Sequence, residues 1–318
     1  MSEFALIERI KRHAVARDDV LLGIGDDAAL LAVPAGMCLA VSVDTLIAGR
    51  HFPLATSAVD VGYKSLAVNL SDLAAMGAEP AWATLSLSLP SFDSTWLDQF
   101  CAGFSELARE FNVALVGGDT VRGPLSITVG IQGFVDPKRA LLRSRAQVGD
   151  LLWVSGTLGD AALGLKALKA KAGDQHLSLL QRLNRPTPRV AAGLFLRDFS
   201  VAAIDVSDGL LADLTHLARR SQVGARVYLN QLPTSAFARS YVGLDDYQLR
   251  LHQLSGGDDY ELLFTSHPSS RAEIEAGFVD LGLQVTVIGE ITADPTVEVL
   301  DADGRRFIPA LRGFDHFA

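Results

Sequence analysis

The feature that most constrains the fold is the repeated alternation of strand-like and helix-like hydrophobic patterns along the chain. Residues 81–89, AWATLSLSL, alternate apolar and polar side chains with a period of two, which is typical of a strand with one buried face. Apolar residues from Leu97 to Phe111 then recur at i, i+3 and i+4 and predict a half-buried helix that begins near Asp93 and Ser94. In the second half, the strand pattern VAAIDV precedes a helix expected from about Leu210 to Arg220. Such alternation predicts α/β or α+β layering.

The length of the chain favours two such domains. With 318 residues, of which 49% are hydrophobic, the chain exceeds the usual size of a single core and can bury two. Periodicity is lost in the segment FVDPKRALLRSRAQVGD, where Pro137 is followed by several basic side chains. We therefore expect a first domain over residues 1–137 and a second over residues 138–318.

Composition and charge exclude several classes of function. The formal net charge is -9, and no run of Lys and Arg is long enough to follow a nucleic-acid backbone. Two cysteines, Cys38 and Cys101, cannot build a disulfide framework or a thiolate metal site, which fits a reducing compartment. No apolar run approaches the ~20 residues that span a bilayer, and Glu3 and Glu8 interrupt the N-terminal segment where a signal peptide would be apolar. We expect a cytoplasmic protein that binds neither nucleic acid nor a membrane.

Aspartates stand at the ends of apolar runs in five or more separate segments, most of them flanked by Gly, Ser or Thr. A carboxylate at the tip of a buried strand is tolerated when it is paired or bound to a cation, and the basic residues nearby are too few to pair them all. Oxygen ligands without His or Cys suit Mg²⁺ or Mn²⁺ and not Zn²⁺. For any one of them, a turn residue or a helix N-cap is the alternative interpretation. The series comprises Asp26, Asp27, Asp44, Asp72, Asp119, Asp205, Asp208, Asp258 and Asp259.

Neither of the two common phosphate-binding loops accounts for these aspartates. The segment GIGDDA matches the dinucleotide pattern G-x-G-x-x-A, but two carboxylates in that turn would repel a pyrophosphate unless metal ions intervened. The P-loop is absent, because the chain contains no Gly-Lys pair. Two unit charges ~4 Å apart interact by ~1 kcal/mol in water and ~4 kcal/mol at an effective dielectric constant of 20. The sequence therefore favours a polyphosphate bridged to the carboxylates by divalent cations, an arrangement suited to phosphoryl transfer.

Seven segments that run from Gly23 to Phe317 cover nearly the whole chain. In chain order they are GIGDDAALL, SVDTLIAGRHF, YKSLAVNLSDLAAMGAEPAW, VGGDTVRGPLSITV, IDVSDGLLADL, SGGDDYEL and GFDHF. In this order they resemble the thiamine-monophosphate kinase family. Some are shared with the wider superfamily of aminoimidazole-ribonucleotide synthetase, selenophosphate synthetase and related hydrogenase-maturation proteins. The third, sixth and seventh are more specific to the narrower family.

The resemblance implies a phosphotransferase of thiamine biosynthesis with a phosphate group as acceptor. In this family the γ-phosphoryl group of ATP passes to thiamine monophosphate, with several Mg²⁺ ions, and ATP lies between two domains. The N-terminal domain carries a sheet that forms a barrel-like interface in a homodimer. Carried onto this sequence, the resemblance implies metal ligands at Asp27, Ser42, Val43, Asp44, Asp72, Asp119, Asp205 and Asp208, with Asp44, Asp72 and Asp119 foremost in the transfer. It implies nucleotide contacts at Gly118, Asp119, Arg143 and Ser207, and thiamine monophosphate contacts at His51, Asp258 and Phe314.

Two positions depart from the family pattern, and two other functions stay open. Val43 stands where Thr is frequent, so only its backbone carbonyl could serve a metal, and Asp258 stands where Glu is frequent, one methylene longer. The first alternative is another ATP-using enzyme of the superfamily, such as selenophosphate synthetase, although no Cys precedes Gly23 here. The second alternative is a Mg²⁺-nucleotide sensor that binds ATP without turnover.

Overall fold

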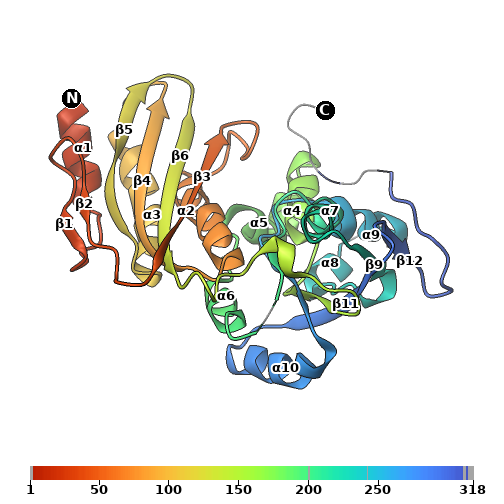
Figure 1. Ribbon diagram of the computed structural model, residues 1–318. Helices are drawn as coiled ribbons and strands as arrows, with labels where there is room; N and C mark the ends of the chain where they lie inside the picture. The colour runs from red at the N-terminus through yellow and green to blue at the C-terminus, as the bar shows by residue number, and fades with distance from the viewer. Residues whose placement is uncertain (1–2, 200, 242, 311–312, 314–318) are drawn as a thin grey trace. The chain divides into compact units, whose positions relative to one another are not determined.

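The computed structural model describes residues 3–199, 201–241, 243–310 and residue 313 (Figure 1). The chain divides into two compact units. The first comprises Met1–Leu73 and Ala78–Lys138, and the second comprises Ala74–Gly77 and Arg139–Ala318. Each unit combines a sheet with helices, which confirms the mixed α/β class. No helix in the described part of the chain is long and apolar enough to cross a membrane.

The first unit is built on a four-stranded sheet with the strand order β3-β6-β4-β5. Only β4 and β5 are parallel, and helix α3 connects them, while the other neighbours are antiparallel. A separate two-stranded ribbon pairs β1 with β2. The elements are α1 (Glu3–Lys11), β1 (Val20–Leu22), β2 (Leu30–Leu31), β3 (Cys38–Ile47), α2 (Ala58–Ala75), β4 (Glu79–Leu89), α3 (Ser94–Glu110), β5 (Ala114–Arg122) and β6 (Ser126–Val135).

Helices α2 and α3 cover one face of this sheet (Figure 1). They cross at two glycines that leave no room for a side chain: a Cβ on Gly62 would lie 2.0 Å from the carbonyl oxygen of Phe100, and one on Gly103 would lie 1.8 Å from that of Val59. Helix α3 begins where the sequence predicts, because the Asp93 carboxylate accepts hydrogen bonds from the N–H groups of Thr95 and Trp96. The close crossing fixes α2, and with it Asp72, against the sheet.

The face of edge strand β3 that points away from α2 exposes a row of apolar side chains. Leu39, Val41, Val43 and Ile47 are 42%, 65%, 63% and 44% exposed. They alternate with Ala40, Ser42, Asp44 and Leu46, which point to the opposite face because strand side chains alternate. This face of β3 is therefore more apolar than is usual for an exposed strand surface.

The second unit contains a six-stranded sheet with the order β12-β9-β11-β7-β10-β8, in which only β12 and β9 are parallel. Helix α7 packs its leucines on this sheet in one large core cluster, and the glycine before it, Gly209, lies within the site segment described below. The elements are β7 (Leu151–Ser155), α4 (Asp160–Lys169), α5 (Leu177–Asn184), α6 (Val190–Leu196), β8 (Ala203–Asp205), α7 (Leu210–Ser221), β9 (Gly224–Tyr228), α8 (Ala236–Arg239), α9 (Asp246–Ser255), β10 (Leu262–Ser266), α10 (Arg271–Asp280), β11 (Val285–Thr292) and β12 (Val297–Leu300).

Candidate functional site

In the first unit, Ser42 and Asp72 make direct contact. The Ser42 hydroxyl donates a hydrogen bond of 2.5 Å to Oδ2 of Asp72, which joins strand β3 to helix α2. Asp44 follows two residues after Ser42 on β3, so the two side chains share the face that α2 covers, and both are half-buried. Val43 points to the opposite, exposed face. Three of the predicted ligands therefore gather on one face, and Val43 offers only its backbone there.

Gly118 and Asp119 lie beside a small cavity of about 60 Å³ in the first unit. Gly118 has a φ of +149°, and a Cβ on it would lie 1.8 Å from the carbonyl oxygen of Leu85, so only glycine fits. Asp119 is exposed, and its Oδ1 accepts the N–H of Thr120 at 2.8 Å. The cavity has a mostly apolar lining, which is formed by Ile7, Ile10, Ile24, Leu85, Leu115, Gly117, Gly118, Asp119 and Thr120.

The structure places Asp27 and His51 in two different turns of the first unit. Asp27 is exposed, and its N–H is bonded to the carboxylate of Asp26 at 2.9 Å. His51 follows β3, and its Nδ1 accepts the N–H of Ile47 at 2.9 Å. Because Nδ1 accepts, the neutral imidazole carries its proton on Nε2. The ring of His51 thus has a fixed orientation. The sequence alone did not show this, because a single His after a turn could equally be an unconstrained surface residue.

In the second unit, Asp205 ends strand β8, and Ser207 and Asp208 lie in the short loop that connects β8 to α7. One oxygen of Asp213, Oδ2, accepts the N–H groups of Ser207, Asp208 and Gly209 at 3.1, 3.1 and 3.2 Å. Asp213 is 3% exposed, and burial, with a further contribution from the Asp208 carboxylate, raises its pKa to about 7, whereas the three N–H bonds act in the opposite direction. Asp213 is not among the predicted site residues, although an acidic side chain on the buried face of a predicted helix could have identified it.

A second loop, residues 256–261, lies directly against the first. The N–H of Asp258 donates to the carbonyl of Ser207, and the N–H of Tyr260 donates to that of Val206, both at 2.8 Å. The N–H of Val206 in turn donates to the carbonyl of Glu261 at 2.8 Å. The fold therefore brings Asp258 close to the segment that contains Asp205, Ser207 and Asp208, which lies about 50 residues earlier in the sequence.

Two further predicted residues of the second unit lie elsewhere or are not described. Arg143 is exposed, and its carbonyl accepts a hydrogen bond from the hydroxyl of Ser221 at the C-terminal end of α7, the end opposite to the loop that contains Asp208. Phe314 lies outside the described residues. The residue before it, Gly313, is close to the start of α7, since a Cβ on it would lie 2.5 Å from Cβ of Ala212.

The predicted ligands fit Mg²⁺ in their chemistry, because the predicted side-chain ligands offer carboxylate or hydroxyl oxygens and Val43 offers a backbone carbonyl oxygen. Within the described ranges, no three His, Cys, Asp or Glu side chains are grouped so that they could hold a metal ion. Mg²⁺ typically retains several waters and takes one or two carboxylates together with substrate phosphates. The donor set suits that mode of binding and not an all-protein cage.

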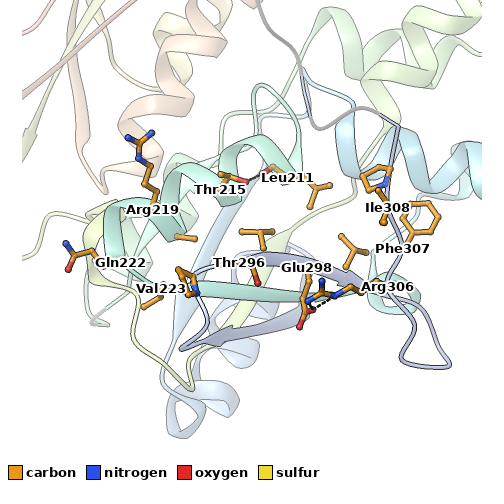
Figure 2. Close-up of a pocket in the computed structure, with 15 residues that line it drawn as sticks. Leu211, Thr215, Arg219, Gln222, Val223, Thr296, Glu298, Arg306, Phe307 and Ile308 are labelled. Carbon is orange, nitrogen blue, oxygen red and sulfur yellow. Dashed lines mark hydrogen bonds and ion pairs between the residues drawn. The ribbon is translucent and has the colours of Figure 1, made fainter.

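A pocket of about 700 Å³ in the second unit is separate from these residues. It lies between α7, β12 and residues 306–309 (Figure 2), where Arg306 is paired with Glu298. None of the predicted site residues lines it. We therefore assign no part of the candidate site to this pocket.

Comparison with known families defines the class of protein. The model of the AIR synthase related protein, N-terminal domain, matches residues 25–135, and that of the C-terminal domain matches residues 147–302. These two matches include nearly all of the predicted site residues and both loops of the second unit.

Individual relatives narrow the class further. The chain is 47% identical to a thiamine-monophosphate kinase of Salmonella typhimurium strain LT2 over 99% of this chain and 98% of that protein. Among solved structures, the thiamine-monophosphate kinase of Stenotrophomonas maltophilia K279a is 51% identical with a TM-score of 0.89, over 96% of this chain and 98% of that one. A structure described as AaThiL complexed with AMPPCP and TMP is 32% identical with a TM-score of 0.79, over 99% and 97%. The chain belongs to the thiamine-monophosphate kinase family.

Proposed function

We propose that this chain transfers the γ-phosphoryl group of ATP to thiamine monophosphate and releases thiamine diphosphate and ADP. The observation that carries the proposal is the full-length similarity to thiamine-monophosphate kinases, one of which is described in complex with AMPPCP and TMP. AMPPCP is an analogue of ATP with a methylene group in place of the oxygen between the β- and γ-phosphorus atoms, so that relative holds an ATP analogue together with TMP.

The residues of each unit have separate proposed roles. In the first unit, Ser42, Asp44, Asp72 and Asp119 would hold metal ions, and Asp119 would also contact the nucleotide. In the second unit, Asp205 and Asp208 would hold metal ions, Ser207 would contact the nucleotide and Asp258 would contact thiamine monophosphate. Mg²⁺, when bound, neutralises charge on the phosphates and helps to hold them in line. On the basis of the resemblance, we also propose metal contacts at Asp27 and at the backbone carbonyl of Val43. We propose nucleotide contacts at Gly118 and Arg143.

The acceptor contacts follow from the chemistry of thiamine monophosphate. Its thiazolium ring is a cation, which a carboxylate such as Asp258 and an aromatic face such as Phe314 would attract. Its phosphate is an anion, for which the Nε2–H of His51 is a suitable donor.

We also propose a homodimer and a cytoplasmic location. The exposed row Leu39, Val41, Val43 and Ile47 on edge strand β3 supports pairing of two copies through this sheet. The use of ATP as a co-substrate supports the location. Sedimentation of the purified protein tests the first proposal, and an exclusively monomeric species would contradict it.

The function is tested by mixing the purified protein with ATP, Mg²⁺ and thiamine monophosphate and separating the products chromatographically. Thiamine diphosphate and ADP in equal amounts are expected. ATP binding without turnover would favour the nucleotide sensor. ATP hydrolysis that requires selenide, with no thiamine diphosphate, would favour a selenophosphate synthetase-like enzyme.

We predict that the phosphoryl group passes directly to the acceptor without a phosphorylated enzyme. The acceptor is already a phosphate monoester, largely ionised at neutral pH with a second pKa near 6, so it needs little help from a base. The proposed carboxylates are engaged as metal ligands, and positioning suffices for such a transfer. γ-Labelled ATP and Mg²⁺ without acceptor should leave no label on the acid-quenched protein. Stoichiometric, hydroxylamine-sensitive label that moves into thiamine diphosphate would overturn direct transfer.

A further inference from the structure

Two residues of the second unit hold a backbone conformation that secondary structure does not explain. Among the residues that the structure describes, five other than glycine have a positive φ. Asn112, Lys171 and Gln222 directly follow or cap the C-terminal ends of α3, α4 and α7, where left-handed residues are common. Asp258 and Tyr260, with φ of 68° and 50°, lie instead in the loop before β10. A bulky residue in this region is rare, and such strain concentrates at functional sites.

Backbone hydrogen bonds on one side hold this conformation. The N–H groups of Asp258 and Tyr260 donate to the carbonyls of Ser207 and Val206, both at 2.8 Å. The two left-handed residues therefore lie against the segment that follows the proposed ligand Asp205 and contains the proposed ligand Asp208.

The side chains of Asp259 and Glu261, which alternate with the two left-handed residues, hold the loop from its opposite side. Asp259 is 1% exposed, and its Oδ2 accepts the N–H of Gly159 at 2.8 Å. Glu261 is fully buried and pairs with Arg182 at 2.8 Å and with Arg189 at 2.6 Å. A loop fixed on both sides can keep two strained residues, because the surrounding contacts determine their conformation.

The side chain of Tyr260 completes this arrangement. Its hydroxyl donates a hydrogen bond of 3.1 Å to Oδ1 of Asp258, and the residue is only 9% exposed, so the ring has little freedom to move. Asp258 itself is half-buried. The hydroxyl thus holds one oxygen of Asp258 and fixes the direction in which the carboxylate points.

We propose that Tyr260 is a positioning residue for the acceptor: through this hydrogen bond it orients Asp258 toward the thiamine part of thiamine monophosphate. The inference rests on the proposed function, since it takes thiamine monophosphate as the ligand of Asp258. An aspartate reaches one methylene less far than a glutamate, so its orientation decides whether contact is made. A carboxylate held in place before binding also loses less rotamer freedom when the substrate arrives.

Tyr260→Phe removes the hydroxyl alone and tests the proposal. The Kd of thiamine monophosphate, measured by calorimetry in the presence of AMPPCP and Mg²⁺, should rise about tenfold, the order expected for losing a hydrogen bond to a charged group. The KM for thiamine monophosphate should rise similarly, while the KM for ATP stays within about twofold. Tyr228→Phe is a matched control, because the hydroxyl of Tyr228 on β9 also donates to a carboxylate, that of Glu290 on β11, at 3.0 Å and outside the site. This control should bind both substrates as the wild type does.

A double-mutant cycle separates positioning from a general structural effect. If Tyr260 acts through Asp258, Asp258→Ala and the double variant Asp258→Ala/Tyr260→Phe should bind thiamine monophosphate equally weakly. Effects that add fully, or equal losses of affinity for both substrates, would overturn the proposal. Wild-type binding of thiamine monophosphate without turnover would contradict the proposed function alone, because the cycle can still be read from Kd. No binding by the wild type would overturn both.

Discussion

Asp44→Asn and Asp119→Asn should each lower kcat at least about a hundredfold while leaving the fold intact. The substitution removes the charge of a proposed metal ligand and leaves its volume unchanged. A unit charge ~4 Å from another at an effective dielectric constant of 20 contributes ~4 kcal/mol, and each ~1.4 kcal/mol of transition-state stabilisation is a factor of ten in rate. A loss of a hundredfold or more is therefore expected even when the remaining ligands compensate in part.

The measurement is the initial rate of thiamine diphosphate formation over a range of Mg²⁺ concentrations. Half-maximal activity of either variant should need more Mg²⁺ than that of the wild type. Asp280→Asn is the control, since this carboxylate is exposed at the end of helix α10, and it should leave rate and Mg²⁺ dependence unchanged. Wild-type turnover by both Asp44→Asn and Asp119→Asn would contradict the proposal that these carboxylates bind the metal ions.

Glu261→Gln should have the largest effect on stability, a loss of about 3–5 kcal/mol in the free energy of unfolding. The Glu261 side chain is 1% exposed and receives two hydrogen bonds from Arg189, at Nε and Nη2, and one from Arg182. Arg182 and Arg189 are themselves 19% and 12% exposed, so removing the carboxylate leaves two largely buried guanidinium groups without their partner. Breaking a buried ion pair from one side is costly for this reason.

Chemical denaturation monitored by circular dichroism measures this loss. Glu275→Gln is the matched control, because the pair between Arg271 and Glu275 on α10 is exposed, and such pairs contribute about 0.2–1 kcal/mol. A change for Glu261→Gln as small as that of the control would show that the two arginines find other partners.

Local patterns were sufficient to predict the longer elements. The alternation in AWATLSLSL corresponds to β4, and the aspartate before α3 caps that helix as expected. The helix predicted from about Leu210 to Arg220 corresponds to α7, which spans Leu210–Ser221. The short helices α5, α6, α8 and α9 were not predictable in this way. Helices of four to ten residues are stabilised mainly by packing, which no local pattern records.

The candidate site was predictable as a set of residue types but not as an arrangement. Asp258 and Asp259 look equivalent in SGGDDYEL, yet the first is half-buried beside Ser207 and the second is buried against Gly159. Burial accordingly raises the pKa of Asp259 well above its usual range. The role of Glu261 could not be predicted because its partners include Arg189, which is 72 residues away along the chain. The role of Tyr260 depends on a left-handed backbone that is held by a hydrogen bond to the distant Val206. Such pairings are set by the topology of the sheet, which the sequence does not display.

The carboxylate of Asp213 has a consequence for how a polyphosphate can approach the second unit. Successive backbone N–H groups at the start of a helix form an anion-binding concavity in many nucleotide-binding proteins. Here the N–H groups of Ser207, Asp208 and Gly209 donate to a carboxyl group that the chain itself supplies. These three N–H groups are therefore not available to a phosphate, and the side chains that the loop offers are the Ser207 hydroxyl and the Asp208 carboxylate. A phosphate at this loop must therefore be recruited by cations, so that nucleotide affinity and cation affinity are thermodynamically linked at this place in the fold.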